Sequence, residues 1–516
     1  MSSTSESEEV LSEAFRARLS NLGGGASLTF AGRMSGKVIG FGTQIYIASL
    51  LGGRFYGVYT LAITTFGLVH MVSQLGLQEG SVRYISKYLS EGREPQLRGV
   101  AIQSALIPFT VGCLTGSILY VGSDLISQLV FGEPALASAF RLLAVGIPLM
   151  ATMMATANAT RGFQDVKFFV GIKFFVHPLT NLLLVGVLYG LGYDLEGVLA
   201  AWVIAAGLGA VLSLSSLVYL THNETTTSDW SVPWRPTLGY ALPVLLVMLV
   251  QVLLLQLDTL MLGALSSDTS EVGIYQAAAR TALLLTVVPL SLGTIFAPIV
   301  SDLHTQGDYD TLERLYTVTT KWTIYLSIPV VIVLFSEASS FLVLFGSEFV
   351  AGSTALLVLS MGHLVAGSVG QSDTILKMSG YEQIELINVI VILVINAVLN
   401  YALIPEYGSL GAATATATAI VLLNVLRFVE VVQLFGIVPF ERRMWKSGVA
   451  TAIAAAAGYL SSNALNFGPL LDIVLVATIT GGLFLLTLLT LGLDTEDAAI
   501  VRFLGETLRS YSSRHD

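Results

Sequence analysis

Long apolar segments recur along almost the whole chain and are separated by short polar ones. A helix of about 20 residues spans the roughly 30 Å of hydrocarbon in a bilayer, so each segment is long enough to cross it. The pattern predicts an all-α polytopic membrane protein with about 14 transmembrane helices, not the short alternating segments of a β-barrel. The predicted spans are 27–50, 56–78, 100–121, 137–158, 168–190, 197–220, 238–263, 273–299, 321–345, 352–376, 384–404, 410–434, 446–464 and 469–492.

Basic residues gather after every second predicted span, whereas the alternate loops hold only Arg54 and Arg141. The positive-inside rule then places both termini in the cytoplasm, which requires an even number of spans. The cytoplasmic basic residues are Arg83, Lys87, Arg93, Arg98, Arg161, Lys167, Arg235, Arg314, Lys321, Lys377, Arg442, Arg443, Lys446, Arg502, Arg509 and Arg514.

The two halves of the chain resemble each other. "YGVYTLA" (Tyr56–Ala62) opens the second span and "VGIYQAA" (Val272–Ala278) opens the eighth, and "TRGFQD" after the fourth span matches "MSGYEQ" after the tenth. Six spans per repeat give both repeats one orientation, as in parallel-repeat transporters. We expect two six-helix lobes, 26–222 and 237–440, joined by a linker at 223–236. Two extra spans (441–494), an acidic cytoplasmic tail (1–25) and a cytoplasmic surface helix (495–516) complete the prediction.

Composition narrows the function. The chain is 54% hydrophobic and 12% charged, with a formal net charge of −10 and one cysteine, Cys113. A cysteine metal site or disulfide framework within one chain is therefore excluded. The acidic, lysine-poor composition suits a halophilic prokaryote, or an ordinary acidic membrane protein. "MSSTSESEEV" does not resemble a signal peptide, so we expect the first span to direct insertion.

The loops hold no Walker-type glycine loop and no metal-ligand spacing, so we expect neither an enzyme nor a bound cofactor or metal. A nucleic-acid partner is not expected either, because the chain has no basic run. Without an ATPase domain, transport would be driven by an ion gradient (Na⁺ or H⁺), a partner, or the substrate gradient.

Cations inside the predicted spans are candidates for function because a central charge costs about 2.5–3.5 kcal/mol on insertion scales. Arg33, Lys37 and Gln44 form one helical stripe in the first span. The two cations repel each other unless an anion faces them, so the stripe predicts contact with a lipid phosphate. Snorkelling to the cytoplasmic headgroups is the alternative.

The fifth span carries Lys173, His177 and Asn181 at four-residue steps, and Pro178 is expected to kink it. Lys173 could bind the same anion or snorkel inward. His177 could carry protons, or could be a packed histidine without a role in transport.

Asp258 shares a stripe with Gln251 in the seventh span, and Arg280 follows Gln276 in the eighth. The two spans are neighbours in sequence, so we expect an Asp258–Arg280 ion pair that a substrate phosphate could displace. The alternatives are a free acid that binds Na⁺ or a proton, and an isolated protonated acid.

Two further charge pairs are predicted near the cytoplasmic face. Asp373 and Lys377 are spaced i, i+4 at the end of the tenth span, and Arg427 and Glu430 are spaced i, i+3 in the twelfth. Both could be self-neutralised helix pairs, although Lys377 could also contact substrate.

The order of "LDTLMLGAL", "VGIYQAAAR", "RLYTVTTKWTIYLSIP" and "YGSLGAATATA" resembles the polysaccharide-biosynthesis flippases. These belong to the superfamily of the MATE drug exporters and the lipid II flippase. The opening "LLGGRFYGVYTLA" is also similar, with Gly53 where that family often has proline. The resemblance implies a 14-span exporter with two six-helix lobes that moves lipid-linked oligosaccharide across the bilayer.

We therefore expect a flippase that moves a polyprenyl or dolichyl phosphate-linked oligosaccharide from the cytoplasmic to the outer leaflet, for surface polysaccharide or glycoprotein assembly. The lobes would rock around a cationic central cavity. The alternatives are a MATE-like ion-coupled antiporter, an ion-coupled permease, or a non-transporting scaffold of a glycan-assembly complex. Expected partners are membrane lipids and glycosyltransferases of the same pathway, with the chain a monomer. The expected cavity cations are Arg33, Lys37, Lys173, Arg280 and Lys377.

Overall fold

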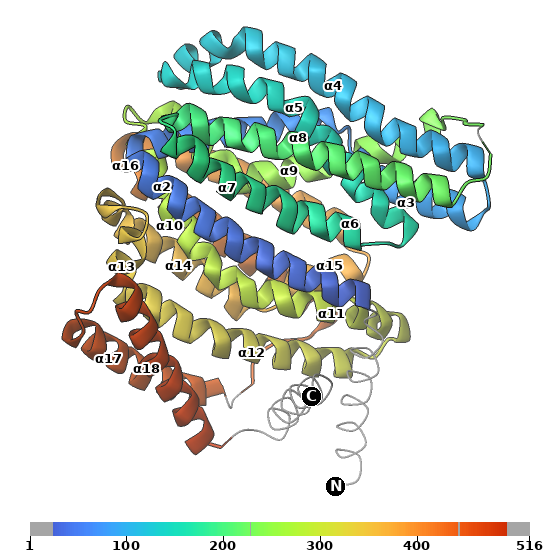
Figure 1. The fold of residues 1–516 in the computed structure, drawn as a ribbon. Helices are drawn as coiled ribbons and strands as arrows, with labels where there is room; N and C mark the ends of the chain where they lie inside the picture. Colours follow the sequence, from blue (N-terminus) through green and yellow to red (C-terminus); the bar gives the residue numbers. More distant parts are fainter. Residues whose placement is uncertain (1–23, 228, 442–443, 493–516) are drawn as a thin grey trace, which may run out of the picture.

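The computed structural model describes residues 24–227, 229–441 and 444–492, and they form helices joined by short loops (Figure 1). The predicted tail through residue 23, Arg442, Arg443 and the C-terminal surface helix lie outside the described residues. The longer helices are α2 (Gly24–Ser73), α3 (Leu77–Ser90), α4 (Glu94–Leu129), α5 (Ala135–Thr160), α7 (His177–Gly190), α8 (Asp194–Asn223), α9 (Trp234–Leu265), α10 (Ser270–Ala282), α11 (Val287–Gln306), α12 (Tyr309–Ser336), α14 (Ser353–Ser368), α16 (Glu382–Phe435), α17 (Trp445–Ala464) and α18 (Pro469–Thr490). Shorter elements are η1 (Arg161–Phe163), α6 (Lys167–Val170), the π-helical η2 (Gly171–Val176), η3 (Leu283–Thr286), α13 (Ala338–Val343), η4 (Ser347–Gly352) and α15 (Ser372–Met378).

The predicted all-α membrane class is confirmed. Within the described residues, 11 helical stretches are long and apolar enough to cross a membrane. Two of them contain a glycine with positive φ, Gly52 in α2 (φ 68°) and Gly408 in α16 (φ 52°). A side chain is strained in that backbone region, so glycine allows the chain to turn there. Both breaks fall between two predicted spans, while the total of about 14 spans stays a prediction.

Helices of the first half pack mainly on one another, and so do those of the second half (Figure 1). Helices α4, α5, α8 and α7 form the upper layers of the view, α14 and α12 lie below, and α17 and α18 pack together against α12. The largest hydrophobic core is shared between the halves, since it joins Tyr56 and Phe140 to Tyr275, Phe345 and Phe349. The two lobes therefore meet through apolar side chains.

The linker between the lobes is fixed to the start of α4. The Oε2 atom of Glu94 accepts hydrogen bonds from the backbone N–H groups of Thr226 (2.7 Å) and Thr227 (3.0 Å). The backbone N–H of Ser231 donates to the carbonyl of Pro95 at 2.8 Å. Helix α9, which follows, packs on α3 and α2 as well as on α16. It therefore touches both lobes.

Candidate functional site

The first segment of α2 presents two cations without an acid partner. Arg33 and Lys37 are exposed, and among the described residues no carboxylate lies within ion-pair distance of either. Gly32 and Gly36 bring this segment close to η2, because a Cβ atom on Gly36 would lie 3.0 Å from the Phe174 ring. The cationic stripe thus begins beside the fifth predicted span.

Lys173 lies in the π-helical turn η2, one turn before Pro178. Proline has no N–H group, so Pro178 cannot donate a hydrogen bond to the preceding turn of the helix. Single π-helical turns are rare in helices and are often found at functional sites. The Lys173 Nζ atom lies 5.1 Å from the centre of the Phe169 ring and 5.7 Å from that of Phe174. These rings stabilise the ammonium group without neutralising it.

Arg33 and Arg161 are charged neighbours of Lys173, as is the carboxylate of Glu79. Arg161 Nη1 lies 3.4 Å from Glu79 Oε1 and donates to Asn158 Oδ1 at 2.9 Å. We call Arg33, Lys37, Lys173 and Arg161 the N-lobe cation cluster. Its four positive charges share one carboxylate partner within the described residues, so the cluster can accept an anion.

His177 and Asn181 follow Lys173 on α7 and are both buried. The His177 ring packs edge-on against Trp202, with 5.1 Å between ring centres. Its Nε2 atom and the Oδ1 atom of Asn181 have no hydrogen-bond partner in the described part of the chain. The geometry fits a packed histidine, and a role in proton coupling stays a prediction.

The stripe on α2 ends where the lobes meet. Gln44 Oε1 accepts a hydrogen bond from the Tyr56 hydroxyl at 3.0 Å, and Arg280 is a charged neighbour of Tyr56 and Tyr59. With its amide turned toward the guanidinium, Gln276 accepts from Arg280 Nε at 2.7 Å and Nη2 at 3.1 Å. Arg280 therefore has an amide partner and no carboxylate within the described residues.

The predicted Asp258–Arg280 ion pair is wrong. Asp258 is buried and accepts hydrogen bonds from the hydroxyl groups of Tyr275 and Thr416 and from the backbone N–H of Thr259. Tyr275 and Arg280 are five residues apart on α10, so they face different sides of that helix. Tyr275 faces Asp258, and Arg280 lies toward α2. Gln251, predicted to line the same path, is exposed on α9.

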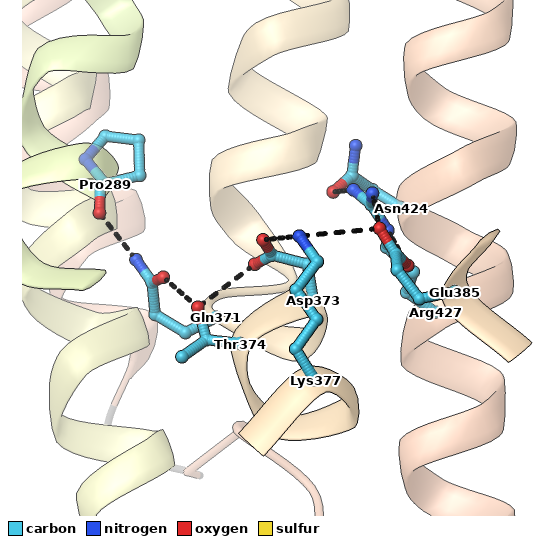
Figure 2. Close-up of polar contacts among 8 residues, drawn as sticks. All are labelled: Pro289, Gln371, Asp373, Thr374, Lys377, Glu385, Asn424 and Arg427. Atoms are coloured by element: carbon cyan, nitrogen blue, oxygen red, sulfur yellow. Dashed lines mark hydrogen bonds and ion pairs between the residues drawn. The ribbon is translucent and has the colours of Figure 1, made fainter. Parts of the chain in front are cut away.

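Figure 2 shows a second polar network, on the C-lobe. The predicted Asp373–Lys377 pair is present, with 3.1 Å between Nζ and Oδ2. Lys377 Nζ also lies 3.6 Å from Glu385 Oε1, and Arg427 Nε donates to Glu385 Oε2 at 2.8 Å. Both cations of this network, Lys377 and Arg427, are thereby neutralised, unlike those of the N-lobe cation cluster.

The predicted Arg427–Glu430 pair is wrong in its partner. Arg427 binds Glu385 from the preceding segment of the same long helix α16, while Glu430 Oε2 accepts from Asn388 Nδ2 at 2.6 Å. The chain folds back at Gly408, so residues distant in sequence come side by side. Sequence reasoning missed Glu385, which stands at the start of a predicted span and looks like an ordinary interfacial acid.

The tenth predicted span is broken, and this break positions Asp373 and Lys377. Helix α14 ends at Ser368, Gly370 has a φ of 67°, and α15 begins at Ser372. Gln371 Nε2 donates to the carbonyl of Pro289 at 2.8 Å, which ties the break to α11 (Figure 2). The short helix α15 is thereby held with both charged side chains toward α16.

Within the described residues, no group of three or more His, Cys, Asp or Glu side chains is placed to hold a metal ion. The arrangement instead offers an anion a series of cations, from the N-lobe cation cluster to Arg280.

This chain is similar in sequence to two flippases and in fold to solved transporter structures. A probable low-salt glycan biosynthesis flippase, Agl15, of Haloferax volcanii is 24% identical over 76% of this chain and 80% of its own length. The lipid II flippase MurJ of Bacillus subtilis is 22% identical over 75% of this chain and 78% of its own. A solved structure of lipid II flippase MurJ in an inward closed conformation superposes with a TM-score of 0.70 at 15% identity, covering 89% of this chain and 97% of that one.

An inward-facing multidrug resistance MATE family transporter superposes with a TM-score of 0.65 at 16% identity, over 78% of this chain and 94% of that one. The MatE family matches residues 243–402. These likenesses agree with the expectation of a multi-pass membrane transporter and not an enzyme. The sequence model described as polysaccharide biosynthesis protein matches residues 22–304, more than half of the chain, and the chain therefore belongs to the polysaccharide biosynthesis protein family of the MATE-like superfamily.

Proposed function

We propose that this protein is a flippase that moves a lipid-linked oligosaccharide from the cytoplasmic to the outer leaflet. The observation that carries the proposal is the set of intramembrane cations without acid partners: Arg33, Lys37 and Lys173, followed by Arg280. An unpaired charge is costly in hydrocarbon unless it meets an anion or water. A membrane-embedded substrate that carries such an anion is a polyprenyl or dolichyl phosphate.

The substrate phosphate binds first to the N-lobe cation cluster. Both the ammonium of Lys173 and the guanidinium of Arg33 form charge-assisted hydrogen bonds with phosphate oxygens. The basic residues that follow every second predicted span support a cytoplasmic position for this end of the protein, with both termini inside. The lipid tail stays in the bilayer while the sugar passes between the lobes.

Arg280 then takes the phosphate at the junction of the lobes. Its present partner, Gln276, is neutral, so a phosphate can replace the amide without leaving a buried carboxylate unpaired. Lys377 contributes less, because Asp373 and Glu385 already neutralise it. The lobes rock to expose the sugar outside, as parallel-repeat transporters do.

Asp258 is the candidate for ion coupling by Na⁺ or H⁺. Its carboxyl group is buried and accepts from four donors, the hydroxyl groups of Tyr275, Thr416 and Thr259 and the backbone N–H of Thr259, with no cation beside it in the described structure. A buried acid without a cation gains from binding a proton or a metal cation. The protein works as a monomer beside the glycosyltransferases of its pathway.

The names of the relatives support this choice of substrate, because they include a glycan biosynthesis flippase and a lipid II flippase. A MATE-like antiporter is the alternative, favoured by the MatE match. An antiporter for cationic drugs needs acids that can reach them. Glu79, Asp373 and Glu385 are paired with cations, and Asp258 is buried among hydrogen-bond donors.

The test is to extract lipid-linked oligosaccharides from cells that lack the protein and to assay which membrane face they occupy. Accumulation of finished lipid-linked glycan on the cytoplasmic face supports a flippase, and mass spectrometry then identifies carrier and sugar. Arg280→Gln should fail to restore export at normal protein levels, whereas Arg141→Gln, at an exposed pair with Asp124, should restore it. Full export by Arg280→Gln would contradict the role of Arg280. Full export by each glutamine variant of Arg33, Lys37, Lys173 and Arg280 would favour a scaffold.

A further inference from the structure

The four charged side chains drawn in Figure 2 carry no net charge, unlike the N-lobe cation cluster. Two cations, Lys377 and Arg427, are balanced by the carboxylates of Asp373 and Glu385. An approaching phosphate or metal cation would meet as many like charges as opposite ones, so the four groups attract neither strongly. The side chains of Asp373 and Lys377 nevertheless stay 36% and 35% exposed. An open pair of this kind suits a ligand that is polar and uncharged.

The exposed pair is held in place by a buried pair behind it. Glu385 Oε1 lies 3.6 Å from Lys377 Nζ, and Glu385 in turn accepts from Arg427 Nε at 2.8 Å. Replacing a buried ion pair with apolar side chains is often neutral or stabilising, so stability alone does not explain why these charges are kept. Their effect on the site is to fix the position of the Lys377 ammonium group.

The carboxylate of Asp373 is fixed from the other side. Thr374 Oγ1 lies 3.4 Å from Asp373 Oδ1 and 3.2 Å from Gln371 Oε1. The buried hydroxyl of Tyr316 donates to the Val369 carbonyl at 2.6 Å, which holds the helix break just before these residues. Figure 2 shows the polar contacts as one continuous chain from α11 to α16. A site that is already ordered loses less entropy when a ligand binds.

The chemistry of the exposed pair matches the hydroxyl groups of a sugar. A hydroxyl group both donates and accepts hydrogen bonds, and a sugar ring carries several of them side by side. The Asp373 carboxylate accepts and the Lys377 ammonium donates, with 3.1 Å between Oδ2 and Nζ. The ammonium has three N–H groups and two carboxylate contacts within the described residues. Hydrogen bonds to charged groups are stronger than those between neutral ones, so neighbouring hydroxyls of one sugar can bind here.

We infer that Asp373 and Lys377 form a glycan subsite, which binds hydroxyl groups of an uncharged sugar in the substrate. The inference rests on the proposed function, in which the N-lobe cation cluster binds the phosphate of the same substrate. The start of α2, α6 and α15 lie toward one end of the helix bundle (Figure 1), so one substrate molecule can meet both lobes there. The two lobes thus divide recognition, with phosphate on the first and sugar on the second.

The experiment compares the binding of two ligands to full-length protein in nanodiscs. The first ligand is the lipid-linked oligosaccharide extracted from cells that lack the protein. The second is the same lipid phosphate after mild acid has removed the glycan. Titration with each ligand gives its Kd. The wild type should bind the glycosylated lipid about tenfold or more tightly than the deglycosylated one, because only the former makes hydrogen bonds with the glycan subsite.

Asp373→Ala combined with Lys377→Ala removes both hydrogen-bonding groups without changing the net charge near the substrate. The affinity for the glycosylated lipid should fall about tenfold, to that for the deglycosylated lipid, which should not change. Asp373→Asn keeps the shape of the side chain and should lose less, and it guards against a double variant that fails to fold. Asp124→Ala with Arg141→Ala is the matched control, since it removes another exposed ion pair and should leave both affinities unchanged.

Equal affinity of the wild type for the two ligands would overturn the glycan subsite while leaving the phosphate site in place. An equal loss of affinity for both ligands in the folded variants would also overturn it, and the network would then serve only to hold α15 against α16. Lys173→Gln should weaken the binding of both ligands alike, because both carry the phosphate. A wild type that binds neither ligand would contradict the proposed function together with the subsite.

Discussion

Removal of Arg427 should destabilise the protein far more than removal of Arg427 and Glu385 together. In the folded protein the two side chains are only 12% and 7% exposed and form a paired, doubly hydrogen-bonded contact. Arg427→Leu leaves Glu385 buried, with Lys377 at 3.6 Å as the remaining cation. Removing one partner of a buried ion pair typically costs about 3–5 kcal/mol of stability. Because Lys377 still partly neutralises Glu385, we expect a loss near the lower end, about 3 kcal/mol.

Replacing both partners with leucine removes the buried charge along with its partner. Such exchanges are often neutral or stabilising, so the double variant should lie within about 1 kcal/mol of the wild type. Lys377 keeps Asp373 in both variants. At about 2 °C per kcal/mol for a large chain, Arg427→Leu should lower the apparent melting midpoint by about 6 °C, with the double variant near the wild type.

The assay is thermal unfolding of purified protein in one detergent, followed by size-exclusion chromatography with fluorescence detection. Glu430→Gln is the matched control, because Glu430 binds Asn388 and not Arg427. The reasoning is refuted if the single and double variants melt together, or if Glu430→Gln is as harmful as Glu385→Gln. The latter result would restore the i, i+3 pair predicted from sequence.

Three other predictions test the remaining groups. Lys173→Gln should lower export by about tenfold or more. The melting midpoint should stay the same, because no carboxylate loses an ion-pair partner when Lys173 is replaced. A lower melting midpoint with normal export would contradict this prediction. Asp258→Asn should lower the free energy of unfolding by about 1–3 kcal/mol, measured by thermal unfolding, because the amide NH₂ cannot accept the hydrogen bond from Tyr275. Any dependence of export on Na⁺ or pH should also disappear. Unchanged stability together with unchanged ion dependence would exclude Asp258 from ion coupling. Asp268→Ala should lower the free energy of unfolding by about 0.5 kcal/mol, because the hydrogen bonds from Ser270 are lost. The hydroxyl and the backbone N–H of Ser270 lower the pKa of Asp268. That contribution is present above the ordinary aspartate pKa of 3.8 and is lost as pH falls through the lowered value, so the stability difference from wild type should be constant at neutral pH and vanish only in strong acid.

Apolar segment length predicted most of the fold, because hydrocarbon thickness imposes it on any membrane helix. The breaks at Gly52 and Gly408 fell between predicted spans for the same reason, since the chain must turn at the membrane surface. The pair of Asp373 and Lys377 was also predictable, because one helical turn fixes their separation.

Contacts between helices were not predictable in this way. Asp258 was expected to meet Arg280, but helix rotation turned Tyr275 toward it. Glu385 meets Arg427 only because α16 folds back on itself, and nothing local in the sequence indicates that return. Depth in the membrane can be read from a sequence, whereas the rotation of one helix against another depends on packing across the whole lobe.

Gly57 in α2 and Gly273 in α10 hold the same place in "YGVYTLA" and "VGIYQAA", and a Cβ atom on either glycine would lie 3.2 Å from the backbone nitrogen of the other. This reciprocal contact between the repeats has an evolutionary consequence. Before duplication, the same glycine on two separate half-length chains would have made the same contact about a true two-fold axis, as in an isologous dimer. Fusion into one chain then freed the halves to diverge. Lys167 follows "TRGFQD" at the place where Glu385 follows "MSGYEQ", so one ancestral position now carries opposite charges. A symmetric dimer cannot hold the N-lobe cation cluster on one half and the network of Lys377, Glu385 and Arg427 on the other, and covalent duplication makes that difference possible.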